Sequence, residues 1–252
     1  MTDLPDQFNE RVRPDIIKRA SLSIQANNRQ PYGHDPEAGN KHVTRWRKRR
    51  RAYRSAKGKG RARVPRKISV RRGMQLYGSG AESPNTRGGR RAHGPKAEKD
   101  FSEEINDKER RKGIRSAIAA TADEELVKET HSYDGELPII EDGLESIEKT
   151  SELQEKLKEL GLEDELERVS EKKVRGGKGK KRGRKYRTKT GPLVVVAEDD
   201  GILQAAGNLA GVDASVVDQL NAEKLAPGAE AGRLVVWSKK ALEKMEEDDL
   251  FH

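Results

Sequence analysis

Two segments of the sequence are rich in Lys and Arg, the residue types that bind phosphate groups. The first, residues 41–99, contains 21 Lys and Arg residues against two acidic residues, a net charge of +19. The second, residues 172–189, contains 11 Lys and Arg residues and no acidic residue. Glycines interrupt both segments, and they let backbone N–H groups approach a phosphate closely. The chemistry that these segments predict is electrostatic binding of a polyanion, either nucleic acid or an anionic membrane.

The charge of the chain is segregated. The whole chain carries +9, so the 175 residues outside the two basic segments sum to about −21. Because residues 41–99 cannot bury enough apolar surface to offset their ordering entropy, we predict that this segment is disordered until it binds a polyanion. Basic runs are often solvated tails or localisation signals. Here both runs are internal, and a loop of 59 residues is rare unless it binds something.

Patterns for catalysis or metal binding are weak. The absence of cysteine excludes disulfides and thiolate zinc sites. The five histidines have no metal-ligand spacing, so each is predicted to be solvated or to contact phosphate; they are His34, His42, His93, His131 and His252. The glycines of residues 176–183 precede a predicted strand, whereas a dinucleotide-binding fingerprint follows one. The sequence therefore predicts no enzyme, no cofactor and no metal site.

Targeting signals are also weak. Residues 1–10 lack the apolar core of a signal peptide, and no apolar run approaches the roughly 20 residues that span a bilayer. The lack of cysteine fits a reducing cytosol. Aromatic residues make up 4% of the chain, too few for base stacking to be the main mode of nucleic-acid binding.

The rest of the chain must position the basic segments. Apolar periodicity predicts helices over residues 14–27, 107–122, 150–160, 162–169, 201–209, 221–225 and 239–245. It predicts strands over residues 137–141, 193–197, 212–217 and 233–237, and a frayed tail over 246–252. This alternation predicts an α/β fold with a mostly parallel sheet and helices on both faces.

Several longer motifs occur in a fixed order. They include R-P-D-I-I at 13–17, N-R-Q-P-Y-G at 28–33, R-A-R-V-P-R at 61–66, G-G-R-R-A-H-G-P-K at 88–96 and N-D-K-E-R at 106–110. Later motifs are G-K-G-K-K-R-G-R-K-Y-R at 177–187, A-G-N-L at 206–209 and L-A-P-G at 225–228. In this order, and over nearly the whole chain, the sequence resembles the universal L-four family of large-subunit ribosomal proteins in its archaeal form.

This resemblance implies both a fold and a role. The fold is a three-layer αβα body, residues 1–40 and 100–252, with a long extended basic internal loop over residues 41–99. The role is that of a structural constituent of the large subunit of the cytoplasmic ribosome, which supports subunit assembly. The implied partners are 23S-type ribosomal RNA (rRNA), neighbouring large-subunit ribosomal proteins and the nascent polypeptide. In the family, the loop tip lines a constriction of the polypeptide exit tunnel.

The resemblance and the charge pattern together give the expected site residues. Those expected to bind rRNA are Arg45, Arg47, Lys48, Arg49, Arg50, Arg51, Arg54, Lys57, Lys59, Arg61, Arg63, Arg66, Lys67, Arg71, Arg72, Arg87, Arg90, Arg91, His93, Lys96, Lys178, Lys180, Lys181, Arg182, Arg184, Lys185, Tyr186 and Arg187. The tunnel tip implied by the resemblance comprises Arg71, Arg72, Gly73, Met74, Gln75, Leu76 and Tyr77.

Two stretches depart from the family pattern. Only three residues precede Leu4, where family members begin with a β-hairpin, and residues 46–60 replace an E-S-F-G-S-G-R-G-like stretch.

Two alternative functions remain. A nucleotide- or methyl-donor-dependent RNA-modifying enzyme would need a cofactor pocket at the strand ends, with convergent polar residues. A free RNA-binding regulator would not sediment with large subunits.

Overall fold

The computed structural model describes residues 4–44, 50, 51, 57, 58, 60, 62–67, 70–72 and 75–252. The chain divides into two compact units. One, called the body below, comprises Met1–Asn28 and Ser102–His252. The other, called the loop unit, comprises Arg29–Phe101.

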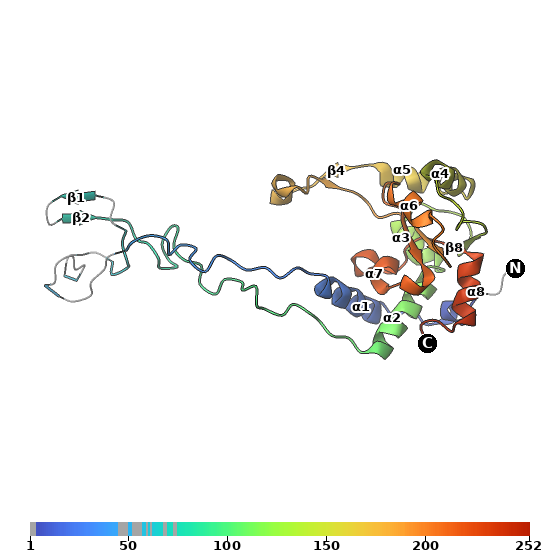
Figure 1. Ribbon diagram of the computed structural model, residues 1–252, viewed down its shortest axis with the longest axis horizontal. Coiled ribbons are helices and arrows are strands. Elements are labelled where there is room, and N and C mark those ends of the chain that lie inside the picture. Colours follow the sequence, from blue (N-terminus) through green and yellow to red (C-terminus); the bar gives the residue numbers. More distant parts are fainter. Residues whose placement is uncertain are drawn as a thin grey trace. The chain divides into compact units, whose positions relative to one another are not determined.

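A four-stranded parallel sheet lies at the centre of the body (Figure 1). Its strands are β3 (Ile139–Glu141), β6 (Leu193–Val196), β7 (Asp213–Val216) and β8 (Val235–Ser238), in the order β3-β8-β6-β7. β8 pairs with β3 and β6, and β6 also pairs with β7. Every residue of β6 and β8 is buried, as expected for continuous apolar strands that are covered on both faces.

Helices cover both faces of this sheet. Val195 and Trp237 pack in one apolar cluster with the helices on one face, whereas Val194 and Val236 pack in a second cluster with the helices on the other face. Neighbouring residues of a strand point to opposite faces, so each central strand serves both clusters. The predicted three-layer αβα fold with a mostly parallel sheet is confirmed.

The helices agree closely with the expected ranges. The first layer contains α1 (Pro14–Asn27), α2 (Asp107–Ala120), α7 (Ala222–Leu225) and α8 (Lys239–Glu247). The second contains α3 (Glu124–Thr130), α4 (Thr150–Glu159), α5 (Glu163–Ser170) and α6 (Ile202–Gly207). Short 3-10 helices are η1 (Asp6–Asn9), η2 (Lys178–Arg182), η3 (Val217–Gln219) and η4 (Pro227–Ala229). In Figure 1, α1, α2 and α7 lie near one another, in agreement with their mutual contacts.

The body contains one helix that was not predicted, and one expectation for the body was wrong. Helix α3 was not predicted, because its sequence E-E-L-V-K-E-T contains only two apolar residues. It forms because Asp123 caps its first turn, accepting hydrogen bonds from two backbone N–H groups. The C-terminal tail is not frayed: α8 runs to Glu247, Gln7 donates to the Leu250 carbonyl, and Arg115 donates to the Phe251 carbonyl.

The loop unit has a different construction. Its strands β1 (Val70–Arg72) and β2 (Gln75–Tyr77) pair antiparallel, and isolated bridges join Thr44 to Lys67 and Arg66 to Gly80. Among the residues of the loop unit whose burial is described (29–44, 50, 51, 57, 58, 60, 62–67 and 78–101), Ala81 is the only buried apolar one. This agrees with the argument that the segment buries too little apolar surface to fold by a hydrophobic core alone.

Replacing Gly211 by Ala is expected to destabilise the body by about 1–3 kcal/mol. Gly211 has a φ of +71°, and an added Cβ would lie 2.1 Å from Cγ1 of Val169 and 2.7 Å from the carbonyl oxygen of Lys189. Urea unfolding of both proteins measures the difference. Gly207→Ala is the control: no atom lies within 4 Å of its added Cβ, so its free energy of unfolding should not fall. Equal stability of the Gly211→Ala protein and wild type would contradict this packing.

Candidate nucleic-acid interface

Where the structure describes their burial, the basic residues of the loop unit are exposed or half-buried. Arg66 and Lys67 are half-buried. The exposed members of the expected set are Arg50, Arg51, Lys57, Arg63, Arg87, Arg90, Arg91, His93 and Lys96. Lys and Arg side chains that are exposed at the surface are suited to contact phosphates.

Part of the expected site lies outside the described residues. These positions are Arg45, Arg47, Lys48, Arg49, Arg54, Lys59, Arg61, Gly73 and Met74. Of the expected tip, Arg71 and Arg72 lie in β1, and Gln75, Leu76 and Tyr77 lie in β2. The register places Arg72 opposite Gln75, so the backbone on either side of the tip is a pair of short antiparallel strands.

Polar contacts fix the backbone of the loop unit. The guanidinium of Arg66 donates to the carbonyl oxygens of Gly78 (3.0 Å) and Ala62 (3.2 Å). The Thr44 hydroxyl donates to the Glu82 carboxylate. Arg66 and Glu82 thus connect sequence-distant parts of the loop unit, which gives structural roles to two charged side chains.

An aromatic cluster joins the two ends of the loop unit, and the sequence did not reveal it. The rings of Tyr32 and Phe101 stack with centroids 5.4 Å apart and planes at 12°. The Arg29 guanidinium lies 4.5 Å from the Phe101 centroid, and the Lys99 ammonium lies 5.4 Å from it. Tyr32 remains 50% exposed, so its ring also offers an aromatic surface to a nucleobase. The only signal in the sequence for this cluster was that a Lys or Arg residue lies within three positions of each of the two aromatic residues.

The second basic segment forms an arm of the body. Strands β4 (Lys173–Val174) and β5 (Tyr186–Arg187) pair antiparallel, and η2 follows Gly177 at the far end. The arm displays exposed residues nearly throughout: Lys178, Lys180, Lys181, Arg182, Arg184, Lys185, Tyr186 and Arg187. Val174 and Tyr186 lie opposite each other and are 58% and 50% exposed. The arm therefore presents both cations and an apolar pair to a partner.

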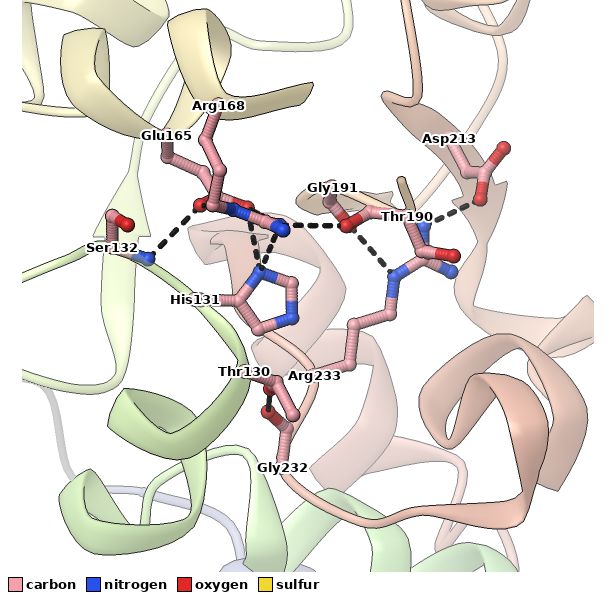
Figure 2. A network of polar contacts seen from close by, with 10 residues as sticks. All are labelled: Thr130, His131, Ser132, Glu165, Arg168, Thr190, Gly191, Asp213, Gly232 and Arg233. Carbon is pink, nitrogen blue, oxygen red and sulfur yellow. Dashed lines mark hydrogen bonds and ion pairs between the residues drawn. The ribbon is translucent and has the colours of Figure 1, made fainter. Parts of the chain in front are cut away.

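A polar network anchors the root of this arm (Figure 2). Arg168, on α5, donates both to the Glu165 carboxylate (2.7 Å) and to the carbonyl oxygen of Thr190 (2.8 Å). Arg233, beside β8, donates to the carbonyl oxygen of Gly191 (3.0 Å) and pairs with Asp213. Two fixed guanidinium groups therefore hold consecutive carbonyl groups where the arm rejoins the sheet.

Glu165 is the centre of this network. Its side chain is fully buried, and its oxygens accept hydrogen bonds from Arg168, from His131 Nδ1 (2.6 Å) and from the backbone N–H of Ser132 (3.0 Å). Burial alone raises the pKa of Glu165, but these hydrogen bonds outweigh it and lower the pKa to about 2. The hydrogen bonds to Glu165 also raise the pKa of Arg168. Glu165 is therefore ionised at neutral pH.

The described part of the chain contains neither a candidate metal site nor a helix that could span a membrane. No group of three or more His, Cys, Asp or Glu side chains there could hold a metal ion. None of its helices is both long enough and apolar enough to cross a bilayer.

Comparisons with known proteins identify the family of this chain. The family model described as the ribosomal protein L4/L1 family matches residues 2–248. The chain is 50% identical over 251 residues to the large ribosomal subunit protein uL4 of Nanoarchaeum equitans, covering 99% of this chain and 94% of that protein.

Two further archaeal relatives carry the same name. The protein of Archaeoglobus fulgidus is 46% identical over 249 residues, which cover 97% of this chain and 92% of the relative. That of Methanosphaera stadtmanae is 45% identical over 254 residues, which cover 99% and 92%. These matches span the body, the loop unit and the arm, and they confirm the resemblance. The chain belongs to the ribosomal protein L4/L1 family.

Proposed function

We propose that this chain is a structural constituent of the large ribosomal subunit in the cytoplasm and that it binds rRNA. The observation that carries this proposal is the pairing of a closed αβα body with two exposed basic extensions, in a chain that matches a ribosomal protein family from residue 2 to 248. That family consists of ribosomal proteins, which agrees with the expectation that the chain is not an enzyme.

The two extensions would divide the work of RNA binding. Residues 41–99 and the arm at 172–189 supply the Arg and Lys side chains, and residues 1–40 and 100–252 form the globular part of the chain that carries them. Arg offers bidentate phosphate contacts and planar stacking, which suit folded RNA. The exposed cations of η2 and the exposed Val174–Tyr186 pair support the arm as an RNA contact. Neighbouring ribosomal proteins would contact the acidic body.

The tip at residues 71–77 would line the polypeptide exit tunnel and meet the nascent polypeptide. This part of the proposal rests on the family resemblance. The strand pairing of β1 with β2 supports it, because a narrow antiparallel ribbon can extend a tip away from its anchoring residues.

Deleting residues 69–80 is expected to leave the body folded, with a change of less than about 0.5 kcal/mol in its free energy of unfolding. The reason is that both apolar clusters of the body consist of residues outside the deleted segment. Urea unfolding measures body stability, and sedimentation measures subunit assembly, which should be largely retained. Unfolding of the body in this variant would refute the separation of body and tip.

Sedimentation also tests the main proposal. A tagged chain is expressed in an archaeal host, and ribosomal particles are separated on gradients before and after a high-salt wash. Retention in the large subunit after the wash is expected. A chain that remains in the free fraction would instead be an RNA-binding regulator. Stabilisation by nucleotides or methyl donors in a thermal-shift panel would favour the RNA-modifying enzyme.

A further inference from the structure

We propose that a cavity at the root of the arm at 172–189 binds one nucleotide of the RNA, with its phosphate between Lys173 and Arg187 and its sugar or base against His131. This inference rests on the proposed RNA-binding function. It adds a specific recognition pocket in the body to the distributed phosphate contacts of the extensions.

The cavity has a volume of about 450 Å³. It is bounded by the end of α3, the end of α5, the two sides of the arm and η4; its lining includes Thr130, His131, Arg168, Lys173, Arg187 and Pro227. Ligand pockets typically measure about 300–1,000 Å³ and combine apolar walls with a few placed polar groups. The cavity therefore has the size that a single nucleotide requires, and its lining is mostly polar, with the carboxylates of Glu171 and Glu230 beside its cations.

His131 supplies a hydrogen-bonding group that no other side chain uses. The residue is only 7% exposed, and its Nδ1 lies 2.6 Å from the Glu165 carboxylate. Because the ionised carboxylate can only accept, Nδ1 carries the proton and donates it. Nε2 has no hydrogen-bond partner among the described residues, and it can accept a hydrogen bond when Nδ1 carries the only proton of the ring. Figure 2 shows Nε2 on the side of the ring that faces away from Glu165.

This acceptor matches RNA chemistry. A ribose 2′-hydroxyl or a base amino group can donate to a neutral imidazole nitrogen, and the 2′-hydroxyl distinguishes RNA from DNA. The ring cannot swing freely, since Glu165 is itself held by Arg168 and by the Ser132 backbone. His131 is therefore pre-oriented, so a ligand would not have to order it on binding.

Two cations that line the cavity, Lys173 and Arg187, suit it to bind an anion. Lys173 and Arg187 are directly opposite each other in the β4–β5 ladder, and both line the cavity. Like charges directly opposite in a two-stranded ladder destabilise it. Neither side chain has an ion-pair partner in the described part of the chain, whereas Lys189 pairs with Glu171 at 3.7 Å. A phosphate between the two cations would relieve their repulsion and fix the arm.

The nucleotide in the cavity could belong to RNA or be a free nucleotide, because both carry a phosphate, a sugar and a base. Crosslinking tests the RNA source. The chain has no cysteine, so Thr188→Cys gives a single attachment point for a photo-crosslinker at the cavity wall. A matched control, Glu246→Cys, places the same group on an exposed position of α8. Both full-length proteins are bound to large-subunit rRNA transcripts at low salt and irradiated, and the crosslinked nucleotides are mapped by reverse transcription.

The expected result is one dominant crosslinked nucleotide for the Thr188→Cys protein that is absent with the Glu246→Cys protein. Adding His131→Asn to Thr188→Cys should reduce its yield about twofold to tenfold, the range for one hydrogen bond. Asn can keep the donor to Glu165 while removing the Nε2 acceptor. Because His131 is buried, Arg187→Ser at an exposed position is a second variant; it should lower the same crosslink and make the salt slope of binding shallower by about one.

The outcomes separate this inference from the proposed function. If every variant binds rRNA tightly but Thr188→Cys gives no dominant crosslink, or neither His131→Asn nor Arg187→Ser reduces it, the pocket is refuted and general RNA binding stands. If the wild-type chain does not bind rRNA, both fail. A thermal shift caused by nucleoside monophosphates, without a crosslink, would identify a free nucleotide as the ligand, overturn the assignment to RNA and favour the RNA-modifying enzyme.

Discussion

Raising the monovalent salt concentration from 50 to 200 mM is expected to weaken rRNA binding by the intact chain roughly a thousandfold or more. Each phosphate that a Lys or Arg side chain neutralises releases condensed counterions, and added salt opposes that release. Neutralising about ten phosphates would give a plot of log affinity against log salt a slope of about −7 to −9. Filter binding to an rRNA transcript at four or more salt concentrations measures this slope.

A charge-removal variant makes this prediction specific to the arm. Changing Lys178, Lys180, Lys181 and Arg182 to Ser removes four cations of η2. The slope should become shallower by up to about four, one for each phosphate that the variant no longer neutralises. The control changes the exposed Lys239 and Lys240 of α8 to Ser, and its slope should match that of wild type. Binding that is independent of salt would refute phosphate neutralisation as the source of affinity.

The sheet was predictable from the sequence because its central strands carry their own signal. The run L-V-V-V at 193–196 is apolar on both faces, and only a strand covered on both sides accommodates such a run in a fold of this size. Helix α3 was not predictable in this way. Its stability comes from the Asp123 cap and from packing of Val127, which is fully buried, and neither creates a period of 3.6 residues.

The basic surfaces were also predictable, since charge and glycine content need no tertiary information. The Glu165 network was not. Glu165 and Arg168 are three residues apart on a helix, a spacing that normally indicates an exposed ion pair. His131 was expected to be solvated or to contact phosphate; the structure shows it buried against Glu165, so the expectation of a solvated side chain was wrong. Only the tertiary fold brings α5 beside residues 131 and 132.

The stack of Tyr32 on Phe101 was unpredictable for a related reason. The two aromatic residues lie at opposite ends of the loop unit in the sequence, and no local pattern links them. Local patterns report charge and periodicity, but they do not report which distant segments meet. In this chain, contacts between segments that are distant in the sequence form the two features that local patterns did not predict. These are the polar network at the root of the arm and the aromatic stack at the ends of the loop unit.

Replacing Glu165 by Gln is expected to lower the free energy of unfolding by about 3 kcal/mol at pH 7. The change leaves Arg168 and His131 beside a neutral group that cannot accept their hydrogen bonds as strongly. Lowering the pKa of the wild-type carboxyl from 4.5 to about 2 corresponds to a similar stabilisation by ionised Glu165. Urea unfolding of wild type and variant at pH 7 measures the difference.

The pH dependence of this difference identifies its cause. The pKa of Glu165 is lower in the folded state than the ordinary value of 4.5, so ionised Glu165 stabilises the folded chain fully above about pH 4.5. This stabilisation declines as the pH falls through 4.5 toward 2, where both states become protonated. The stability difference between wild type and variant should therefore shrink over that range.

Glu163→Gln is the matched control on α5. Because Glu163 forms only an exposed pair with Lys158 (3.2 Å), this substitution should change the free energy of unfolding by less than about 0.5 kcal/mol. A difference for Glu165→Gln that stays constant down to pH 2 would show that packing, rather than the buried charge, holds the root of the arm.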